Sequence, residues 1–321
     1  MALWLVTGGA GFIGSHFIEM ALARSDAKLI CLDCYNDFYD PELKRSNVAK
    51  FHENDRVEVV EEDFCNHSAM LALFEQHAVS HVVHLGAYAG VRYSVENPFV
   101  YERSNVAGTL SLLEAARRFP VERFLLASSS TVYGRGAAVP FTEDAPLGIP
   151  MSPYGATKRS AELLALAYHD LHRIPSVCLR PFSVYGPRLR PDLAMTVFTD
   201  AIEYGKPLPL FGDGSIRRDF THVSDICAGF YAALSADGVV GESINLGHSE
   251  PIEVRALIAE LERALGKKAV IDQQPEKPGD MPITYANLEK AERLLGYRPQ
   301  MDFREGVSEY VAWFREYHAG K

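Results

Sequence analysis

The stretch Thr7-Gly8-Gly9-Ala10-Gly11-Phe12-Ile13-Gly14 joins the first predicted strand to the first predicted helix and decides the fold. A tight turn between strand and helix needs a residue that tolerates a positive φ, which glycine does. A second glycine lets a diphosphate approach the backbone, and a third lets the helix pack closely on the strand. The N-terminus of the helix offers free N–H groups and the positive end of its dipole. The stretch therefore predicts a dinucleotide site.

Short apolar runs alternate with amphipathic stretches through the first half of the chain. Strands are predicted at residues 3–6, 28–32, 57–60, 81–85, 123–127 and 176–180. Helices are predicted at residues 14–23, 68–77, 100–118 and 156–172. Strand–helix alternation of this kind is typical of a parallel, doubly wound sheet with helices on both faces. The expected class is α/β, with a Rossmann-type sheet.

The pattern changes near residue 185, where glycine, proline and arginine become dense. Helical and loop signals dominate afterwards, with helices predicted at about residues 252–265 and 303–318. We expect a Rossmann domain made of residues 1–182 and about 220–250. The remainder, about 183–219 and 251–321, is expected to form a smaller α/β lobe that binds the substrate.

Composition excludes several classes of function. The net charge is −10, so a generally basic surface for nucleic acid or for an anionic membrane is absent. No export signal and no apolar run of membrane-spanning length is visible, which favours a cytoplasmic protein. The five cysteines show no zinc-ligand spacing, and Cys31 and Cys34 are interpreted as reduced thiols of a strand. We expect no metal.

Two carboxylates follow predicted strands and bear on the choice of dinucleotide. Asp33 ends the second strand, 19 residues beyond Gly14. A carboxylate there accepts hydrogen bonds from ribose hydroxyls and repels a 2′-phosphate, which favours NAD over NADP. Asp63 follows the third strand, where it either meets the adenine or caps the helix before Ser68.

The segment Tyr154-Gly155-Ala156-Thr157-Lys158 carries the predicted chemistry. Tyr154 and Lys158 are four residues apart, so both side chains fall on one face of a helix. A nearby ammonium, together with a positive nicotinamide ring, stabilises phenolate and is expected to lower the pKa of Tyr154. The fifth strand runs into Ser128-Ser129-Ser130-Thr131-Val132-Tyr133-Gly134, a second polar segment for the same site.

Together the glycine stretch, Asp33 and these two segments resemble the extended short-chain dehydrogenase/reductase family. The resemblance implies that Ser129 hydrogen-bonds the reacting hydroxyl, that Tyr154 is the acid/base, and that Lys158 tunes Tyr154 and binds the nicotinamide ribose. The residues expected to bind the cofactor, NAD, are Gly8, Gly11, Phe12, Ile13, Gly14, Asp33, Asp63 and Lys158.

The reaction is narrowed by what stands before Val132-Tyr133-Gly134. Sugar 4,6-dehydratases of this family carry an Asp-Glu pair there, whereas this chain has Ser130 and Thr131. Without that acid and base, elimination has no obvious catalyst. Oxidation at C4 of a nucleotide sugar, followed by return of the hydride to the opposite face, is epimerisation with NAD regenerated in each cycle.

Other segments resemble the UDP-glucuronate 4-epimerases within the family. They are Asn36-Asp37-Phe38-Tyr39-Asp40-Pro41, Gly90-Val91-Arg92-Tyr93-Ser94 and Leu179-Arg180-Pro181-Phe182-Ser183-Val184-Tyr185-Gly186-Pro187. The resemblance implies that four hydroxyls surround the sugar carboxylate: Ser129, Ser130, Thr131 and Ser183. Ordinary hydrogen bonding at strand ends is the alternative for this hydroxyl cluster. For the nucleotide and its diphosphate, the expected residues are Arg92, Arg190, Arg218 and Asp280, with Arg92 alternatively at the lobe interface.

The expected function is thus conversion of UDP-glucuronate to UDP-galacturonate. Alternatives are a UDP-glucose or UDP-N-acetylglucosamine 4-epimerase, a UDP-glucuronate decarboxylase, and a non-catalytic nucleotide-binding module. The presence of both Tyr154 and Lys158 disfavours the last. By family analogy we expect a homodimer held by a four-helix contact, formed by residues 100–118 and 156–172 of each subunit.

Overall fold

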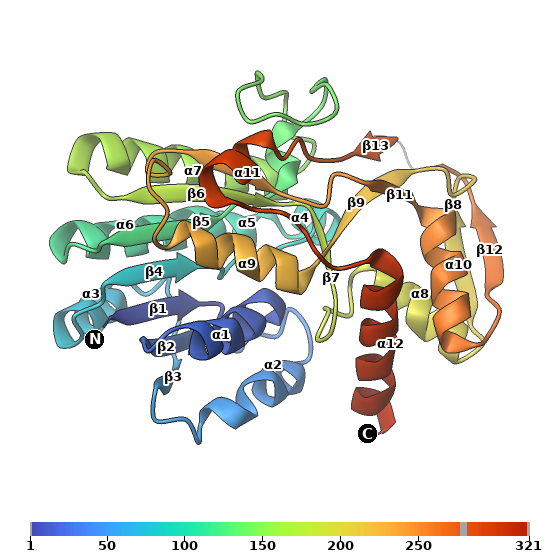
Figure 1. The fold of residues 1–321 in the computed structure, drawn as a ribbon, viewed down its shortest axis with the longest axis horizontal. Helices are drawn as coiled ribbons and strands as arrows, with labels where there is room; N and C mark the ends of the chain where they lie inside the picture. Colours follow the sequence, from blue (N-terminus) through green and yellow to red (C-terminus); the bar gives the residue numbers. More distant parts are fainter. Residues whose placement is uncertain (1, 277–280, 320–321) are drawn as a thin grey trace.

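The computed structural model describes residues 2–276 and 281–319. Among these residues, seven parallel strands form one sheet in the order β10-β6-β5-β4-β1-β2-β3 (Figure 1). Its strands are β1 (Leu3–Thr7), β2 (Lys28–Asp33), β3 (Val57–Glu61), β4 (His81–His84), β5 (Arg123–Ala127), β6 (Ser176–Pro181) and β10 (Ser243–Leu246). The order reverses direction at β1, so the carboxyl ends of β1 and β4 flank the crevice where such sheets bind ligands. The predicted doubly wound sheet is confirmed.

Alternate residues of each strand enter two different cores, because both faces of the sheet are covered. Val6 packs on the side of α1 (Phe12–Arg24) and α9 (Val223–Ala233). Leu5 packs on the opposite side. That side is covered by α3 (His67–Gln76), α6 (Thr109–Arg118) and α7 (Pro153–His172). The near-continuous apolar runs of the strands follow from this burial on both faces.

A smaller lobe follows β6 in the chain and lies beyond the carboxyl end of the sheet (Figure 1). Its helices are α8 (Ala194–Glu203), α10 (Val254–Leu265) and α12 (Phe303–Ala319). Its strands are β7 (Ser183–Tyr185), β8 (Pro207–Phe211), β9 (Arg217–His222), β11 (Pro251–Glu253), β12 (Val270–Gln274) and β13 (Ile283–Thr284). Strands β7, β11 and β13 all pair with β9, and β12 pairs with β8. The chain returns to the main sheet at β10, with α11 (Glu289–Leu295) packed beside it.

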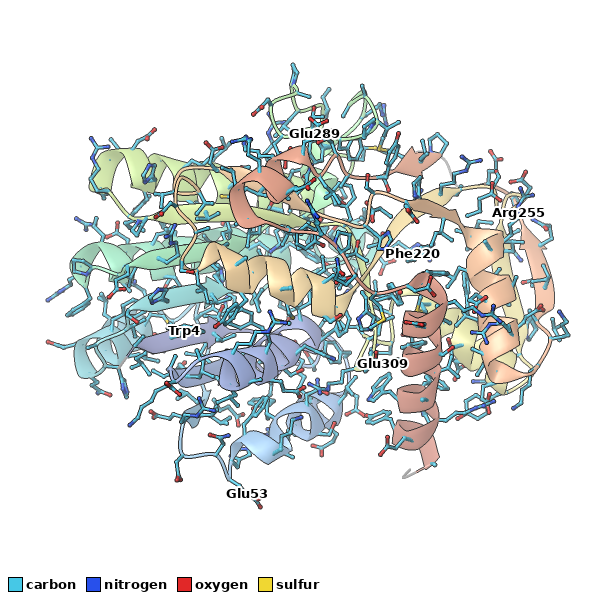
Figure 2. The ribbon with its side chains drawn as sticks, viewed as in Figure 1. Trp4, Glu53, Phe220, Arg255, Glu289 and Glu309 are labelled. Atoms are coloured by element: carbon cyan, nitrogen blue, oxygen red, sulfur yellow. The ribbon has the colours of Figure 1, made fainter. Side chains whose placement is uncertain are left out.

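The lobe and the main sheet share one apolar cluster, which fixes the lobe against the edge where the site forms. Leu257 of α10 and Tyr310 of α12 belong to the same cluster as Val6 of β1. Figure 2 labels Phe220 on β9 and Glu309 on α12, two elements in contact near the junction. The ring of Phe220 lies 5.8 Å from that of Phe303 at the start of α12.

Two features of the fold differ from the expectations. The helix predicted at residues 100–118 is interrupted: α5 (Pro98–Tyr101) is followed by a π-helical segment, Glu102–Gly108, before α6 begins. The lobe also contains more strand than its loop-like sequence indicated: besides the short β7, β11 and β13 it has β8, β9 and β12, which are five or six residues long. None of the helices in the described ranges is long and apolar enough to cross a membrane.

Candidate active site

The glycine stretch forms a turn that no other residue type fits at two positions. Gly8 has a φ of +65°. At Gly14 an added Cβ would lie 2.2 Å from the carbonyl oxygen of Gly8, which no real contact allows. Helix α1 begins after Gly11, which provides no side-chain cap, so N–H groups of the first turn stay available to an anion. This part of the site has the shape that the sequence predicts.

Asp33 lies at the end of β2 with its carboxylate directed at the glycine turn. It accepts the N–H of Ala10 at 3.2 Å and the N–H of Tyr35 at 3.0 Å. Burial raises the pKa of Asp33, and the Lys44 ammonium and the backbone N–H groups oppose this shift. Lys44, which the sequence analysis missed, is itself buried and donates to the carbonyl and side-chain oxygens of Asn36 at 2.7 and 2.8 Å.

Asp63 does not cap the following helix, so that alternative is wrong. The N-cap of α3 is Asn66, whose side chain accepts the N–H of Ala69. Asp63 instead accepts the N–H of Cys65 at 2.9 Å and a hydrogen bond from Arg103 at 2.5 Å.

Ser129, Thr131 and Tyr154 come together at the carboxyl end of β5. The hydroxyl and backbone N–H of Thr131 donate to the Ser129 oxygen at 3.0 and 3.2 Å. Ser129 also interacts with Tyr154 and opposes the rise in the pKa of its phenol. Ser129 therefore lies between Thr131 and Tyr154.

Burial raises the pKa of Tyr154, and the groups that oppose the rise are Ser129 and the Arg190 guanidinium. The predicted lowering by Lys158 together with the nicotinamide ring stays a prediction, because it concerns the protein with its cofactor bound. The Lys158 ammonium is buried and donates to the carbonyl oxygen of Ala127 at 2.7 Å. Burial lowers the pKa of Lys158 to about 8, against the opposing charge of Glu162.

The predicted arginines occupy different surroundings. Arg190 makes two hydrogen bonds to Asp192, at 2.9 and 2.7 Å, and its guanidinium lies 5.4 Å from the ring centroid of Phe38. Arg218 donates to the carbonyls of Arg217 and Met281. Arg92 lies on α4 (Val91–Glu96) with its guanidinium 5.5 Å from the ring of Phe211 in the lobe. Asp280 lies outside the described residues.

The remaining hydroxyls lie at the same edge of the sheet. Ser130 begins a short 3-10 helix, Ser130–Tyr133, directly after Ser129. Ser183 begins β7, two residues after the end of β6, the neighbour of β5. Ser128 is buried, and its hydroxyl has no hydrogen-bond partner within residues 2–276 and 281–319. An unsatisfied buried hydroxyl beside Ser129 is consistent with a ligand group at this position.

Asn105 is a site residue that the sequence analysis missed. It lies in the π-helical segment, and its amide oxygen accepts the N–H of Tyr88 while its amide nitrogen donates to the Tyr88 carbonyl, both at 2.9 Å. The same nitrogen donates to Thr157 of α7 at 3.1 Å. Isolated π turns occur often at functional sites, but the hydrophobic periodicity of a sequence carries no signal for them.

Aromatic rings connect Tyr88, which Asn105 holds, to α7, the helix that carries Tyr154. The Tyr101 ring lies 5.8 Å from that of Tyr88 and 6.0 Å from that of Tyr154. Phe38 packs on Tyr88 at 5.3 Å and on Tyr93 at 4.9 Å. A continuous aromatic wall thus extends from the loop after β2 to Tyr154.

A Rossmann-type sheet with a glycine turn, an acidic strand end and Ser129, Tyr154 and Lys158 at its carboxyl edge defines a dinucleotide-dependent enzyme that moves a proton to or from a hydroxyl. Comparison with known proteins agrees. The family model described as GDP-mannose 4,6 dehydratase matches residues 5–310. The chain belongs to this family of NAD-dependent epimerases and dehydratases.

Relatives within the family include enzymes of two reaction types. A UDP-glucuronate 4-epimerase of Thermodesulfobacterium geofontis is 41% identical over 317 residues, which cover 98% of this chain and 97% of that protein. The crystal structure of a UDP-glucuronic acid 4-epimerase from Bacillus cereus, in complex with UDP-glucuronic acid and NAD, is 36% identical with a TM-score of 0.93 and covers 98% of this chain and 99% of that one. The dTDP-glucose 4,6-dehydratase DesIV from Streptomyces venezuelae, with NAD bound, is 32% identical with a TM-score of 0.91 and covers 99% and 98%. The fold alone therefore does not separate epimerase from dehydratase.

Proposed function

We propose that this protein epimerises UDP-glucuronate at C4 to UDP-galacturonate, with NAD as its cofactor. The observation that carries the proposal is the cluster of Thr131, Ser129 and Tyr154, in which the hydroxyl of Thr131 stands at one of the two positions where a dehydratase carries its acid and base. Relatives that share nearly the whole chain length, including the Thermodesulfobacterium enzyme, support the same reaction.

The glycine turn and Asp33 fit the adenosine half of NAD. Gly8 and Gly14 lie close together, and no side chain caps the N-terminus of α1. That end of the helix therefore suits a diphosphate. The buried carboxylate of Asp33 suits two ribose hydroxyls and excludes a 2′-phosphate. When bound, NAD supplies a hydride acceptor at the start of each cycle and a hydride donor at its end.

In the proposed cycle, the chain's own residues handle the proton and the orientation of the sugar. Tyr154 accepts the proton of the C4 hydroxyl as the C4 hydride leaves, and returns it to the oxygen when the hydride comes back to the other face. Ser129 donates a hydrogen bond to the same oxygen, and Lys158 holds the nicotinamide ribose. Because the hydride and the proton both return, the reaction consumes no net oxidant.

The sugar carboxylate is assigned to the hydroxyl cluster Ser129, Ser130, Thr131 and Ser183. Neutral hydroxyls can satisfy a carboxylate by hydrogen bonds. A 4-keto uronic acid is a β-keto acid, which loses carbon dioxide when its carboxylate is desolvated and its C–C bond lies parallel to the carbonyl π system. A polar cluster that holds the carboxylate near the ring plane slows that loss, and this distinguishes the proposal from a decarboxylase.

The diphosphate and nucleotide are assigned to Arg92, Arg190 and Arg218, because bidentate guanidinium contacts suit phosphate. The negative overall charge makes such local cations necessary. Asp63 is assigned to the adenine side of the cofactor. A cytoplasmic location completes the proposal, supported by five cysteines that are all free thiols in the structure.

The test of the proposed function is incubation of the purified protein with UDP-glucuronate, followed by NMR of the products. We expect UDP-galacturonate to accumulate until both epimers are at equilibrium. A pentose product would identify a decarboxylase. Absence of turnover, together with turnover of UDP-glucose or UDP-N-acetylglucosamine, would identify a neutral-sugar epimerase and overturn the choice of substrate.

We also propose a homodimer, built on the predicted four-helix contact. A large apolar side chain is exposed on α7, where Leu163 is 60% exposed, and two more are exposed on the short helices just before the predicted 100–118 segment: Val95 on α4 is 64% exposed and Phe99 on α5 is 85% exposed. Helices α4 and α5 both pack against α7, so these side chains belong to neighbouring elements. Exposed large apolar side chains on neighbouring helices support an interaction site there.

Replacing Leu163 by Lys is expected to convert the protein to a monomer, because an ammonium in the centre of an apolar contact is left unpaired. Sedimentation velocity at micromolar concentration measures the change. The matched control is Val270→Lys on β12, which lies outside the predicted contact and is 54% exposed; we expect it to leave the dimer intact. A wild-type protein that sediments as a monomer contradicts the proposal.

A further inference from the structure

Lys158 is held in a buried polar environment that the proposed reaction does not by itself explain. Its side chain is 4% exposed, and its ammonium donates to the carbonyl of Ala127 at 2.7 Å. Glu162 lies one turn further along α7, on the same helix face, and is also buried. A lysine and a glutamate so spaced commonly pair directly. Here the ammonium instead faces the end of β5.

Arg180 binds both oxygens of the Glu162 carboxylate. Its Nε donates to Oε1 at 2.8 Å and its Nη2 donates to Oε2 at 2.9 Å, a bidentate pair between two side chains that are both about 4% exposed. Bidentate pairing fixes the carboxylate in position and orientation. Both oxygens therefore accept hydrogen bonds from β6, and the Lys158 ammonium donates instead to Ala127.

The same guanidinium also fixes the segment that carries Ser129. Its remaining nitrogen donates to the hydroxyl of Tyr133 at 3.1 Å, and its centre lies 4.9 Å from the Tyr133 ring. Tyr133 ends the 3-10 helix that follows Ser129, and its hydroxyl donates to Asn245 of β10 at 2.7 Å. The pair thus connects the catalytic helix, the hydroxyl cluster and the edge strand of the sheet.

We propose that Glu162 and Arg180 are positioning residues for proton transfer: Glu162 keeps Lys158 charged from a distance, and Arg180 prevents the carboxylate from capturing the ammonium. This inference deepens the proposed function, since it concerns the same proton-transfer site. The opposing effects of burial and of Glu162 on the pKa of Lys158 agree with it.

Other titratable groups face this pair from the surrounding elements. His84 of β4 interacts electrostatically with Lys158, and burial lowers the pKa of His84 to about 3, so it is neutral near pH 7. Cys178 of β6 faces Glu162, and burial raises the pKa of its thiol, so it is neutral as well. Burial raises the pKa of Tyr133 to about 12. The charged groups of the cluster are therefore Lys158, Glu162 and Arg180, with Glu143 near Asn245.

The inference predicts opposite shifts from the two halves of the pair. Glu162→Gln removes the distant negative charge, so the pKa of Lys158 is expected to fall by about one unit. Arg180→Gln frees the carboxylate to pair with the ammonium, so the pKa of Lys158 is expected to rise by about one unit. A merely structural pair would give no shift, or the same shift, in both variants.

The measurement is NMR titration of protein with lysines labelled with 13C at Cε, the Lys158 signal being assigned by its loss in Lys158→Met. Because this titration requires no substrate, its result does not depend on whether the protein turns over UDP-glucuronate. The pH profile of kcat/KM is the second readout. Activity requires the ammonium, so the profile should fall above about pH 8 in the wild type, at lower pH in Glu162→Gln and at higher pH in Arg180→Gln.

Two controls keep the result decisive. Glu114→Gln breaks an exposed ion pair with Arg117 on α6 and should leave the titration of Lys158 unchanged. If either single variant fails to fold because a buried charge is left unpaired, the neutral double variant Glu162→Gln/Arg180→Gln takes its place. There the pKa of Lys158 should fall, since the nearer charge is lost. An unchanged or raised value overturns the inference.

Discussion

Tyr154→Phe is expected to reduce the turnover of UDP-glucuronate by a factor of at least about 10³, near the upper part of the range for a lost general acid/base. Loss of the Tyr154 oxygen leaves only the hydroxyls of Ser129 and Thr131 in this cluster, and neither is an effective base for the C4 proton. The ring, which lies 6.0 Å from that of Tyr101, is retained. Product NMR over a long incubation measures the loss.

The control for this variant is the cofactor. Because the substitution removes one oxygen and keeps the packing, the NAD content of the purified protein and its thermal unfolding temperature should match the wild type. Phe38→Tyr, which adds a hydroxyl elsewhere in the aromatic wall, should keep most of the activity. Turnover by Tyr154→Phe at the wild-type rate would remove the tyrosine from the mechanism.

Gly14→Ala is expected to have the second large effect, because it lowers both the stability of the fold and the binding of the cofactor. The added methyl group meets the carbonyl oxygen of Gly8 at 2.2 Å and Cα of Gly9 at 2.8 Å, and both are backbone atoms that a side-chain rotation cannot move. Overpacking of this kind costs about 1–3 kcal/mol or more. We expect a lower midpoint of urea unfolding and protein purified without NAD.

Gly11→Ala is the matched variant. A methyl group there lies 3.0 Å from the same carbonyl oxygen and 4.0 Å from the hydroxyl of Tyr39, so the neighbours need to move only slightly. Its stability should stay close to that of the wild type, while its affinity for NAD falls because the methyl group stands where the diphosphate approaches. Equal loss of stability in both variants would contradict the close packing assigned to Gly14.

Local sequence patterns were sufficient to predict the elements that lie entirely inside one layer of the fold. Six strands of the main sheet were predicted from their apolar runs, as at the buried Arg123–Ala127, whereas β10 at Ser243–Leu246 was not predicted. The glycine turn and the acidic end of β2 also follow, because steric demands at Gly8 and Gly14 restrict the residue type. Pattern reasoning works where one residue type satisfies one local requirement.

The parts that could not be predicted depend on contacts between distant segments. The break at Glu102–Gly108 has no periodic signature, yet it places Asn105 between Tyr88 and Thr157. The partner of Glu162 is Arg180 rather than Lys158, because α7 packs against β6, and spacing along α7 does not reveal this contact.

The return of the chain to the main sheet at β10 has a consequence for synthesis on the ribosome. Strand β10 pairs with β6, and Asn245 on it accepts the hydroxyl of Tyr133, but between β6 and β10 the chain passes through β7, α8, β8, β9 and α9. A nascent chain that ends before residue 243 therefore exposes the open edge of β6 and leaves a buried hydroxyl unsatisfied. We expect the N-terminal half to remain a substrate for chaperones until most of the polypeptide has emerged, rather than to fold as an autonomous unit.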